Sequence, residues 1–242
     1  MTQNIYDTEG FFAGYSRLPR SQGGLDAMPE WPNLRAMLPD LAGSRVVDLG
    51  CGFGWFSRWA REAGAARVLG LDVSQNMLAR ARADTADTAI AYERADLDRL
   101  DLPAASFDLA YSALTLHYLE HLDAMLATVH RALVPGGSLV FSAEHPIYTA
   151  PSTPHWVGEP GHRTWPLDDY LKEGPRSTDW LAKGVIKQHR TVATYLNLLI
   201  GLGFAIRCVE EWGPTAEHVA EHPEWADEVH RPAFLLVSAL RS

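Results

Sequence analysis

Lysine, cysteine and long hydrophobic runs are all scarce in this sequence. Only three of its 242 residues are lysines, and 21 basic residues against 30 acidic ones give a formal net charge of −9. A surface that follows nucleic-acid phosphates or binds an anionic membrane needs concentrated Lys and Arg, so we expect neither partner. No apolar run approaches the ~20 residues of a membrane-spanning helix. The most apolar stretch, Leu196 to Ile206, is interrupted by Asn197 and two glycines.

The two cysteines, Cys51 and Cys208, are too few for a disulfide framework, and neither belongs to a CxxC pair. The N-terminal stretch MTQNIYDTEGFF lacks the basic region and apolar core of a secretory signal. The length, with 47% hydrophobic and 21% charged residues, fits one large globular domain. We therefore expect a single-domain cytoplasmic protein, and the sequence leaves open whether it is a monomer or a homodimer.

Apolar runs of strand length alternate with helical patterns from about residue 44 to residue 144. The predicted strands are 46–49, 67–72, 90–94, 107–112 and 138–143, and two more, 204–210 and 234–240, follow a helix at 192–202. Before residue 138, apolar side chains recur at steps of three and four between Leu119 and Leu133, as on the core face of a helix. Such alternation predicts an α/β fold, with parallel strands joined by crossover helices into a doubly wound sheet.

Two segments break this rhythm. Residues 145–186 contain six prolines and three tryptophans without clear periodicity, which is typical of a functional lid or of a disordered linker. The aromatic content favours an ordered lid. Residues 213–231 carry five acidic side chains before the first Arg or Lys, Arg231, and are predicted to form a solvated surface loop or helix.

The most informative stretch is VVDLGCGFG, from Val46 to Gly54, where a buried strand runs into a glycine-rich turn. Glycine allows a ligand to approach the backbone without meeting a side chain. The pattern is GxGxG, whereas a dinucleotide-binding loop is GxGxxG, and Trp55 occupies the sixth position. A bulky indole at that position argues against NAD or FAD.

Carboxylates recur at the ends of the first three predicted strands. Asp72 lies 24 residues after Asp48, and Asp96 lies another 24 residues on. At the end of the second strand a carboxylate can accept hydrogen bonds from both ribose hydroxyls of an adenosine, and at the end of the third it can accept one from the adenine amino group. A lone Asp would ordinarily form a turn or cap, but three in register with a glycine loop predict a nucleoside site.

In order and spacing, DLGCGFG, GLDVS, RADLDRL, FDLAYSALTLHYL and LVPGGSLVFS resemble the successive motifs of class I S-adenosylmethionine-dependent methyltransferases. Within this class the chain looks most like the small-molecule, ubiquinone/menaquinone-biosynthesis-type group (methyltransferase type 11). The resemblance covers about residues 44–144. It implies a Rossmann-like, mostly parallel seven-stranded sheet with an antiparallel last strand. It also implies S-adenosyl-L-methionine as cofactor, S-adenosyl-L-homocysteine as product and a small-molecule acceptor.

The resemblance implies roles for individual residues. Asp48 and the glycine loop would face the methionine part of the cofactor, Asp72 would bind the ribose, and Asp96 with the Leu97 amide would frame the adenine. The complete set of expected cofactor-binding residues is Tyr15, Arg20, Asp48, Gly50, Cys51, Gly52, Gly54, Asp72, Val73, Met77, Asp96, Leu97, Ser112 and His117. In similar enzymes a leading helix closes over the cofactor, which suggests Tyr15 and Arg20 for its carboxylate. The alternative for that helix is an aromatic stripe that simply packs on the core.

Under this interpretation residues 1–242 form one methyltransferase domain with four parts. They are an N-terminal helical cap (1–42), a cofactor-binding half (43–144), a Pro/Trp-rich lid insert (145–186), and the last helix with the terminal strand pair (187–242). We expect residues 1–30 and 145–190 to build the acceptor pocket.

Three residues are candidates for a catalytic base, which is required only when the acceptor is protonated at working pH. His117 and His145 follow the fourth and fifth strands, and Tyr195 lies near the start of the later helix. The alternatives are cofactor stacking or helix capping for the histidines and an ordinary core role for Tyr195. Residues 117–121 and 218–222 both match the zinc motif HxxEH, but a short pattern repeated in a chain with ten histidines is poor evidence, so no metal is expected.

Two other functions are weighed against this one. A non-catalytic S-adenosylmethionine-binding or regulatory protein would have the same fold and the same motifs. An NAD-dependent oxidoreductase would need the GxGxxG loop that this chain lacks.

Overall fold

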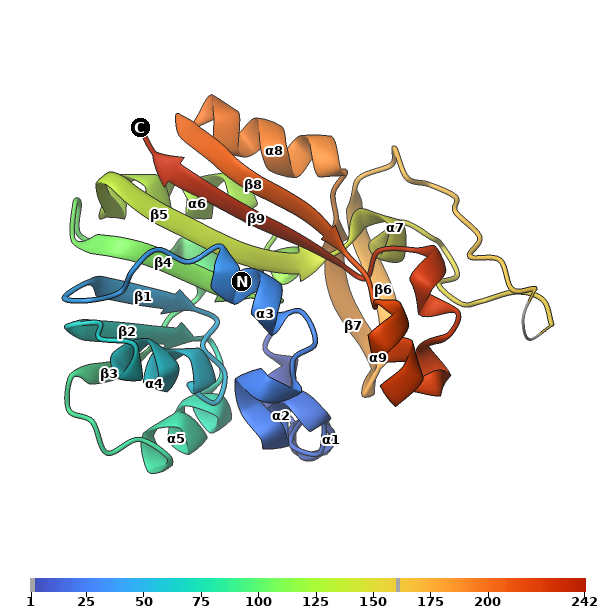
Figure 1. The fold of residues 1–242 in the computed structure, drawn as a ribbon, viewed down its shortest axis with the longest axis horizontal. Helices are drawn as coiled ribbons and strands as arrows, with labels where there is room; N and C mark the ends of the chain where they lie inside the picture. Colours follow the sequence, from blue (N-terminus) through green and yellow to red (C-terminus); the bar gives the residue numbers. More distant parts are fainter. Residues whose placement is uncertain (1–2, 160–161) are drawn as a thin grey trace.

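A seven-stranded sheet forms the centre of the protein (Figure 1). In the computed structural model, which describes residues 3–159 and 162–242, the strand order is β3-β2-β1-β4-β5-β9-β8. The strands of this sheet are β1 (Arg45–Leu49), β2 (Arg67–Asp72), β3 (Ile90–Arg94), β4 (Phe107–Ala113), β5 (Leu133–Glu144), β8 (Phe204–Trp212) and β9 (Phe234–Arg241). Strands β1 to β5 pair in parallel, whereas β9 is antiparallel to both β5 and β8. The predicted mostly parallel sheet with an antiparallel last strand is confirmed.

Helices cover both faces of the sheet. The α-helices are α1 (Glu9–Tyr15), α2 (Pro19–Gly23), α3 (Trp31–Ala36), α4 (Trp55–Glu62), α5 (Gln75–Ala83), α6 (Leu122–Ala132), α7 (Pro146–Thr149), α8 (Val192–Gly201) and α9 (Ala216–Glu221). Short 3₁₀ helices are η1 (Ile5–Asp7), η2 (Gly24–Ala27), η3 (Leu97–Arg99), η4 (Leu116–Tyr118), η5 (Pro223–Trp225) and η6 (Glu228–His230). Within the described residues, no helix has the length and apolar character that a membrane crossing requires.

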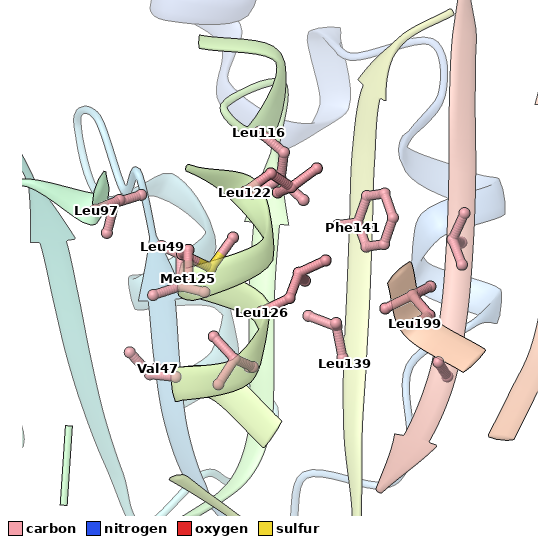
Figure 2. Packing of buried hydrophobic residues seen from close by; sticks show 14 of the residues in the cluster. Val47, Leu49, Leu97, Leu116, Leu122, Met125, Leu126, Leu139, Phe141 and Leu199 are labelled. Atoms are coloured by element: carbon pink, nitrogen blue, oxygen red, sulfur yellow. The ribbon is translucent and has the colours of Figure 1, made fainter. Parts of the chain in front are cut away.

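Alternation along the central strands divides the core between the two faces. Successive strand side chains point to opposite sides, so Val46 joins the cluster under α3, α4 and α5, while Val47 joins the cluster under α6 and α8. Figure 2 shows Met125 and Leu126 of α6, which covers this face, packed with Leu49 and Leu139 of the central strands. Both faces of the sheet are thus buried. Because β1 to β5 pair in parallel, their carboxyl ends meet at one edge of the sheet.

A β-hairpin lies in the segment that we expected to be an ordered lid. Strands β6 (Gly174–Trp180) and β7 (Ala182–His189) pair antiparallel, with Leu181 at the turn in a left-handed conformation (φ 57°). Because β7 ends at His189, it continues past the insert boundary that we placed at residue 186. Residues 146–173 hold α7 and an isolated bridge between Val157 and Thr164.

Three segments far apart in the sequence gather beyond the carboxyl ends of the parallel strands: the N-terminal helices, the β6–β7 hairpin and the α9 region (Figure 1). The hairpin contacts the N-terminal helices, and the segment before the hairpin contacts the region after α9. Phe11 of α1 lies edge-on to Trp180 of β6, with ring centroids 5.5 Å apart, and Trp156 donates a hydrogen bond from its indole N–H to Glu228 of η6. These segments enclose space above the ends of the strands.

Candidate functional site

The glycine loop between β1 and α4 combines close packing with an opening. Gly50, Gly52 and Gly54 all have positive φ, at 79°, 52° and 73°. A Cβ at Gly50 would lie 2.2 Å from the Thr115 hydroxyl, and one at Gly54 would lie 2.1 Å from the Tyr92 hydroxyl. At Gly52 a Cβ would meet nothing within 4 Å. Gly50 and Gly54 therefore keep the loop packed, while Gly52 borders open space.

Asp72, the last residue of β2, holds this loop in place. One carboxylate oxygen accepts the Gly52 N–H at 2.9 Å, and the other accepts the Ser74 N–H at the start of α5, also at 2.9 Å. Burial raises the pKa of Asp72 to about 6. The side chain therefore ties the loop after β1 to the helix after β2, at the edge where the strands end.

Asp48 lies beneath the loop. It is 2% exposed and accepts a 2.6 Å hydrogen bond from the Ser57 hydroxyl, and burial raises its pKa to about 7. With Cys51 it lines a small cavity of about 80 Å³ next to the loop. Burial also raises the pKa of the Cys51 thiol, which is consistent with an inert small side chain. Ser112 is fully buried and donates its hydroxyl to the Leu49 carbonyl, so its visible role is to join β4 to β1.

A larger cavity of about 540 Å³ begins at the loop and continues under the three capping segments. This volume lies in the usual range for a small-molecule site. From the set of residues expected to bind the cofactor, its lining contains Tyr15, Arg20, Gly50, Gly52, Asp72, Val73, Met77, Leu97 and His117. Its far end is lined by Tyr148, Trp180, Trp225, Glu228 and Arg231. The structure thus brings most of the expected residues to one space.

Asp96 follows β3 and caps the short helix after it. It precedes η3 and caps it by accepting the Asp98 N–H at 3.2 Å. Its neighbour Leu97 lines the large cavity, whereas Asp96 is absent from that lining. Any contact between Asp96 and a ligand stays a prediction.

Arg20 reaches the cavity from α2 and has a fully buried partner. Its guanidinium lies 2.9 Å from the Glu30 carboxylate, which is 0% exposed. Tyr15 also lines the cavity, with its ring edge-on to Phe53 of the glycine loop and to Trp180 of the hairpin. For the leading helix we set out two alternatives, packing of its aromatic residues on the core and a position facing the cavity. In Tyr15 the two occur together.

The three candidate bases lie in different surroundings. His117 lines the cavity, accepts the Glu144 N–H on Nδ1 at 3.2 Å, and therefore carries its proton on Nε2 when neutral. Burial lowers its pKa to about 4. His145 is held by the Ile147 N–H on Nδ1 and by Glu211, 2.9 Å from Nε2. Tyr195 is 2% exposed in the core beside Phe141. Neither His145 nor Tyr195 is part of the cavity lining, and we propose no catalytic role for them.

Sequence reasoning missed two charged residues that line the large cavity, Glu144 and Arg231. Glu144 lines the cavity at the carboxyl end of β5, and its Oε1 lies 2.5 Å from the ammonium of Lys187 on β7. Arg231 comes from the acidic segment that we took for a solvated surface, and it is only 7% exposed. The position of Glu144 at a strand end was a usable signal, but nothing in the local sequence pairs it with Lys187. Within the described residues, no three His, Cys, Asp or Glu side chains come together as metal ligands.

Comparison with known proteins decides the family. A model of the "Methyltransferase domain" matches residues 47–141. A crystal structure of an S-adenosylmethionine-dependent methyltransferase from Mesorhizobium loti is 64% identical, covers 90% of this chain and 100% of that one, and superimposes with a TM-score of 0.86. The chain belongs to the S-adenosylmethionine-dependent methyltransferases. A putative S-adenosylmethionine-dependent methyltransferase from Listeria monocytogenes is 38% identical over 89% of this chain and 99% of its own, with a TM-score of 0.82.

Curated relatives with a named acceptor match only part of this methyltransferase. A malonyl-[acyl-carrier protein] O-methyltransferase of Erwinia billingiae is 41% identical over 100 residues. That match spans 41% of this chain and 39% of the relative. More than half of each protein is left outside it.

The loop fits the cofactor of this family, S-adenosylmethionine. A Cβ at Gly52 would project into the open space beside the loop, and the Gly52 N–H donates a hydrogen bond to Asp72. The apolar side chains of Val73, Met77 and Leu97 line the adjoining wall. The carboxylate at the strand end suits the ribose hydroxyls of an adenosyl group, and the apolar wall suits its adenine. The open glycine allows such a ligand to approach the backbone.

Proposed function

We propose that this methyltransferase modifies a small-molecule acceptor held at the aromatic end of the cavity, between the N-terminal helices, the β6–β7 hairpin and the α9 region. The observation that carries the proposal is the continuous lining of one space of about 540 Å³, from Gly52 and Asp72 to Trp180, Trp225 and Arg231. Such a space accommodates an acceptor beside the cofactor and surrounds it with rings. Aromatic walls suit a flat or apolar body.

In this proposal, Asp72 accepts the ribose hydroxyls and Val73, Met77 and Leu97 enclose the adenine. Arg20 and Tyr15 close over the methionine end. The bound cofactor supplies an electrophilic methyl group on a sulfonium. The protein's task is then to hold the acceptor at attacking distance and to keep water out, because proximity and desolvation account for much of such a rate enhancement.

We assign acceptor positioning to Glu144 and His117. Within the described residues, Oε2 of Glu144 is buried without a hydrogen-bond partner, while Oε1 is held by Lys187. Oε2 can therefore accept a hydrogen bond from an O–H or N–H of the acceptor. His117, with its pKa near 4, is neutral at pH 7 and donates from Nε2. It is a better hydrogen-bond donor than proton acceptor, so we assign it this role and not that of the candidate base.

The relatives named malonyl-[acyl-carrier protein] O-methyltransferase suggest a second kind of acceptor, an acid attached to a carrier protein. The match to the Erwinia billingiae relative covers 41% of this chain, so more than half of the chain lies outside it. We favour a free small molecule because the β6–β7 hairpin and the α9 region fold over the cavity.

The test uses the full chain in two steps. Calorimetric titration with S-adenosylhomocysteine, with NAD as the paired control, checks the cofactor site. A panel of free small acids, phenols and amines, together with malonyl-acyl carrier protein, is then offered with S-adenosylmethionine, and release of S-adenosylhomocysteine is measured. Turnover of a free molecule supports the proposal. Turnover of the carrier-bound acid alone, or of nothing in the panel, contradicts it.

A further inference from the structure

The acceptor end of the cavity contains a buried arginine with unused hydrogen-bond donors. The Arg231 side chain is 5% exposed, and the residue lines the cavity. Its Nη2 lies 2.6 Å from Oε2 of Glu228, three residues earlier in the chain. Within the described residues, Nε and Nη1 are both buried without a hydrogen-bond acceptor. Polar groups in such a position cost free energy unless a partner is supplied.

Three aromatic rings surround this guanidinium. Its central carbon is 4.0 Å from the ring centroid of Trp165, 4.7 Å from that of Tyr148 and 5.3 Å from that of Trp156. Ring faces attract the positive charge, but they are weak hydrogen-bond acceptors. The cage therefore fixes the orientation of Arg231 and shields it from water without satisfying its N–H groups.

The neighbouring charges leave Arg231 available. Glu228 contacts it through one nitrogen only, and Trp156 donates its indole N–H to the other oxygen of Glu228. Glu144, the other carboxylate of this end, is already paired with Lys187. Arg163, which is also in the insert, pairs with Asp227 instead.

From this geometry we infer that Arg231 is an anion-binding subsite for the acceptor, and that the acceptor is a small organic carboxylate with an aromatic or apolar body. The inference rests on the proposed function, since it names the class of acceptor for the same cavity. A carboxylate suits a guanidinium because its oxygens accept charge-assisted hydrogen bonds from unpaired N–H groups such as those of Arg231. Of the cage rings, Tyr148 also lines the cavity, together with Trp180 and Trp225, and these rings would pack against the body of the same molecule.

The experiment compares phenylacetate with its neutral isostere phenylacetamide, and other aryl and alkyl acids with their amides. Each is titrated into the full chain loaded with S-adenosylhomocysteine. We expect the acids to bind about tenfold more tightly than their amides, as expected for one charge-assisted hydrogen bond. Arg231→Gln should abolish that preference. The matched control Arg163→Gln removes an insert arginine outside the cavity lining and should keep it.

The outcomes separate the two proposals. If S-adenosylhomocysteine does not bind the wild-type chain, the proposed function fails first. If it binds and no acid in the series binds more tightly than its amide, the carboxylate subsite is overturned and the proposed function stands. A preference that survives in Arg231→Gln also overturns it. If Arg231→Gln does not fold, Arg231→Lys is tested in its place. Lysine keeps the charge but lacks the planar set of N–H donors, so this variant should retain only part of the preference for acids.

Discussion

The Lys187 ammonium lies 2.5 Å from the Glu144 carboxylate, across 43 residues of sequence and between two different sheets. Glu144 ends β5 in the central sheet, and Lys187 is in the hairpin that caps the cavity. Their side chains are 16% and 4% exposed. One ion pair therefore fastens the hairpin to the end of the parallel sheet, and it fixes a carboxylate that lines the cavity.

Removing one partner of this pair should destabilise the fold more than removing both. In Lys187→Met the Glu144 carboxylate stays buried without a counter-ion, and we expect a loss of about 3 kcal/mol in the free energy of unfolding. In the double variant Lys187→Met/Glu144→Gln the charge is gone, and most of that loss should be recovered. Urea unfolding of the two variants measures the difference. Equal losses in the single and double variants would mean that the pair carries no such coupling.

The ribose contact proposed for Asp72 predicts that Asp72→Ala abolishes binding of S-adenosylhomocysteine while the protein stays folded. The carboxylate supplies acceptors that alanine lacks, although losing its hydrogen bonds to the Gly52 and Ser74 N–H groups also loosens the loop. Calorimetry measures binding, and circular dichroism checks folding. Tight binding by the variant would remove Asp72 from the site.

The same contact predicts a pH dependence of binding. Burial raises the pKa of Asp72 to about 6, so in the free protein this carboxyl becomes protonated as the pH falls below 6. The ribose hydroxyls donate hydrogen bonds to the ionised carboxylate, so protonation of Asp72 competes with binding. We therefore expect the affinity for S-adenosylhomocysteine to fall about tenfold from pH 7 to pH 5. Titration calorimetry at several pH values measures it.

Asp48 has its pKa raised to about 7 and titrates in the same range. Asp48→Asn is therefore the control that separates the two carboxylates. The pH dependence should persist in Asp48→Asn and vanish in Asp72→Asn. The reverse pattern would assign the dependence to Asp48.

Alanine substitutions at two glycines of the loop, Gly54 and Gly52, should have different effects on stability and on ligand binding. At Gly54 an alanine Cβ would lie 2.1 Å from the Tyr92 hydroxyl, so Gly54→Ala should cost about 3 kcal/mol of stability, and Tyr92→Phe should relieve part of it. At Gly52 the Cβ meets nothing, and the positive φ alone costs about 1–2 kcal/mol. Gly52→Ala should instead weaken S-adenosylhomocysteine binding, because its methyl group intrudes on the cavity. Thermal melting with and without ligand distinguishes the two effects.

The sequence predicts the central sheet well because local patterns determine it. The 67–72 and 90–94 strands agree with β2 and β3 at both ends, since each is a short apolar or alternating run bounded by turn residues. The glycine loop and Asp72 are likewise local features of the sequence. The resemblance to the methyltransferase motifs was enough to predict that they lie together at one site. All of these lie within the part of the chain where strands and helices alternate.

The acceptor end depends on contacts that no local pattern records. Strand β6 begins with Gly174 and Pro175, which are weak strand formers. Its burial alternates along the strand, but its sequence GPRSTDW does not alternate apolar and polar residues, so no period-two signal marks it in the sequence. Arg231 is buried by rings that come from residues 148–165, and its burial cannot be read from the acidic segment around it. The same reason explains why Glu144 was missed as a partner of Lys187.

Trp180 should couple the hairpin to the N-terminal helix. Its ring lies 5.5 Å from that of Phe11 and 6.4 Å from that of Tyr15, both in α1, and such edge-to-face pairs each contribute about 0.5–1.5 kcal/mol. Trp180→Ala should therefore raise amide hydrogen exchange in Glu9–Tyr15 about tenfold, while exchange in β1 and β4 stays unchanged. Leu171→Ala, in the same insert but 87% exposed, is the matched control and should change neither. Unchanged exchange in α1 would show that this helix is held by the glycine loop, through Phe12 and Phe53, without help from the hairpin.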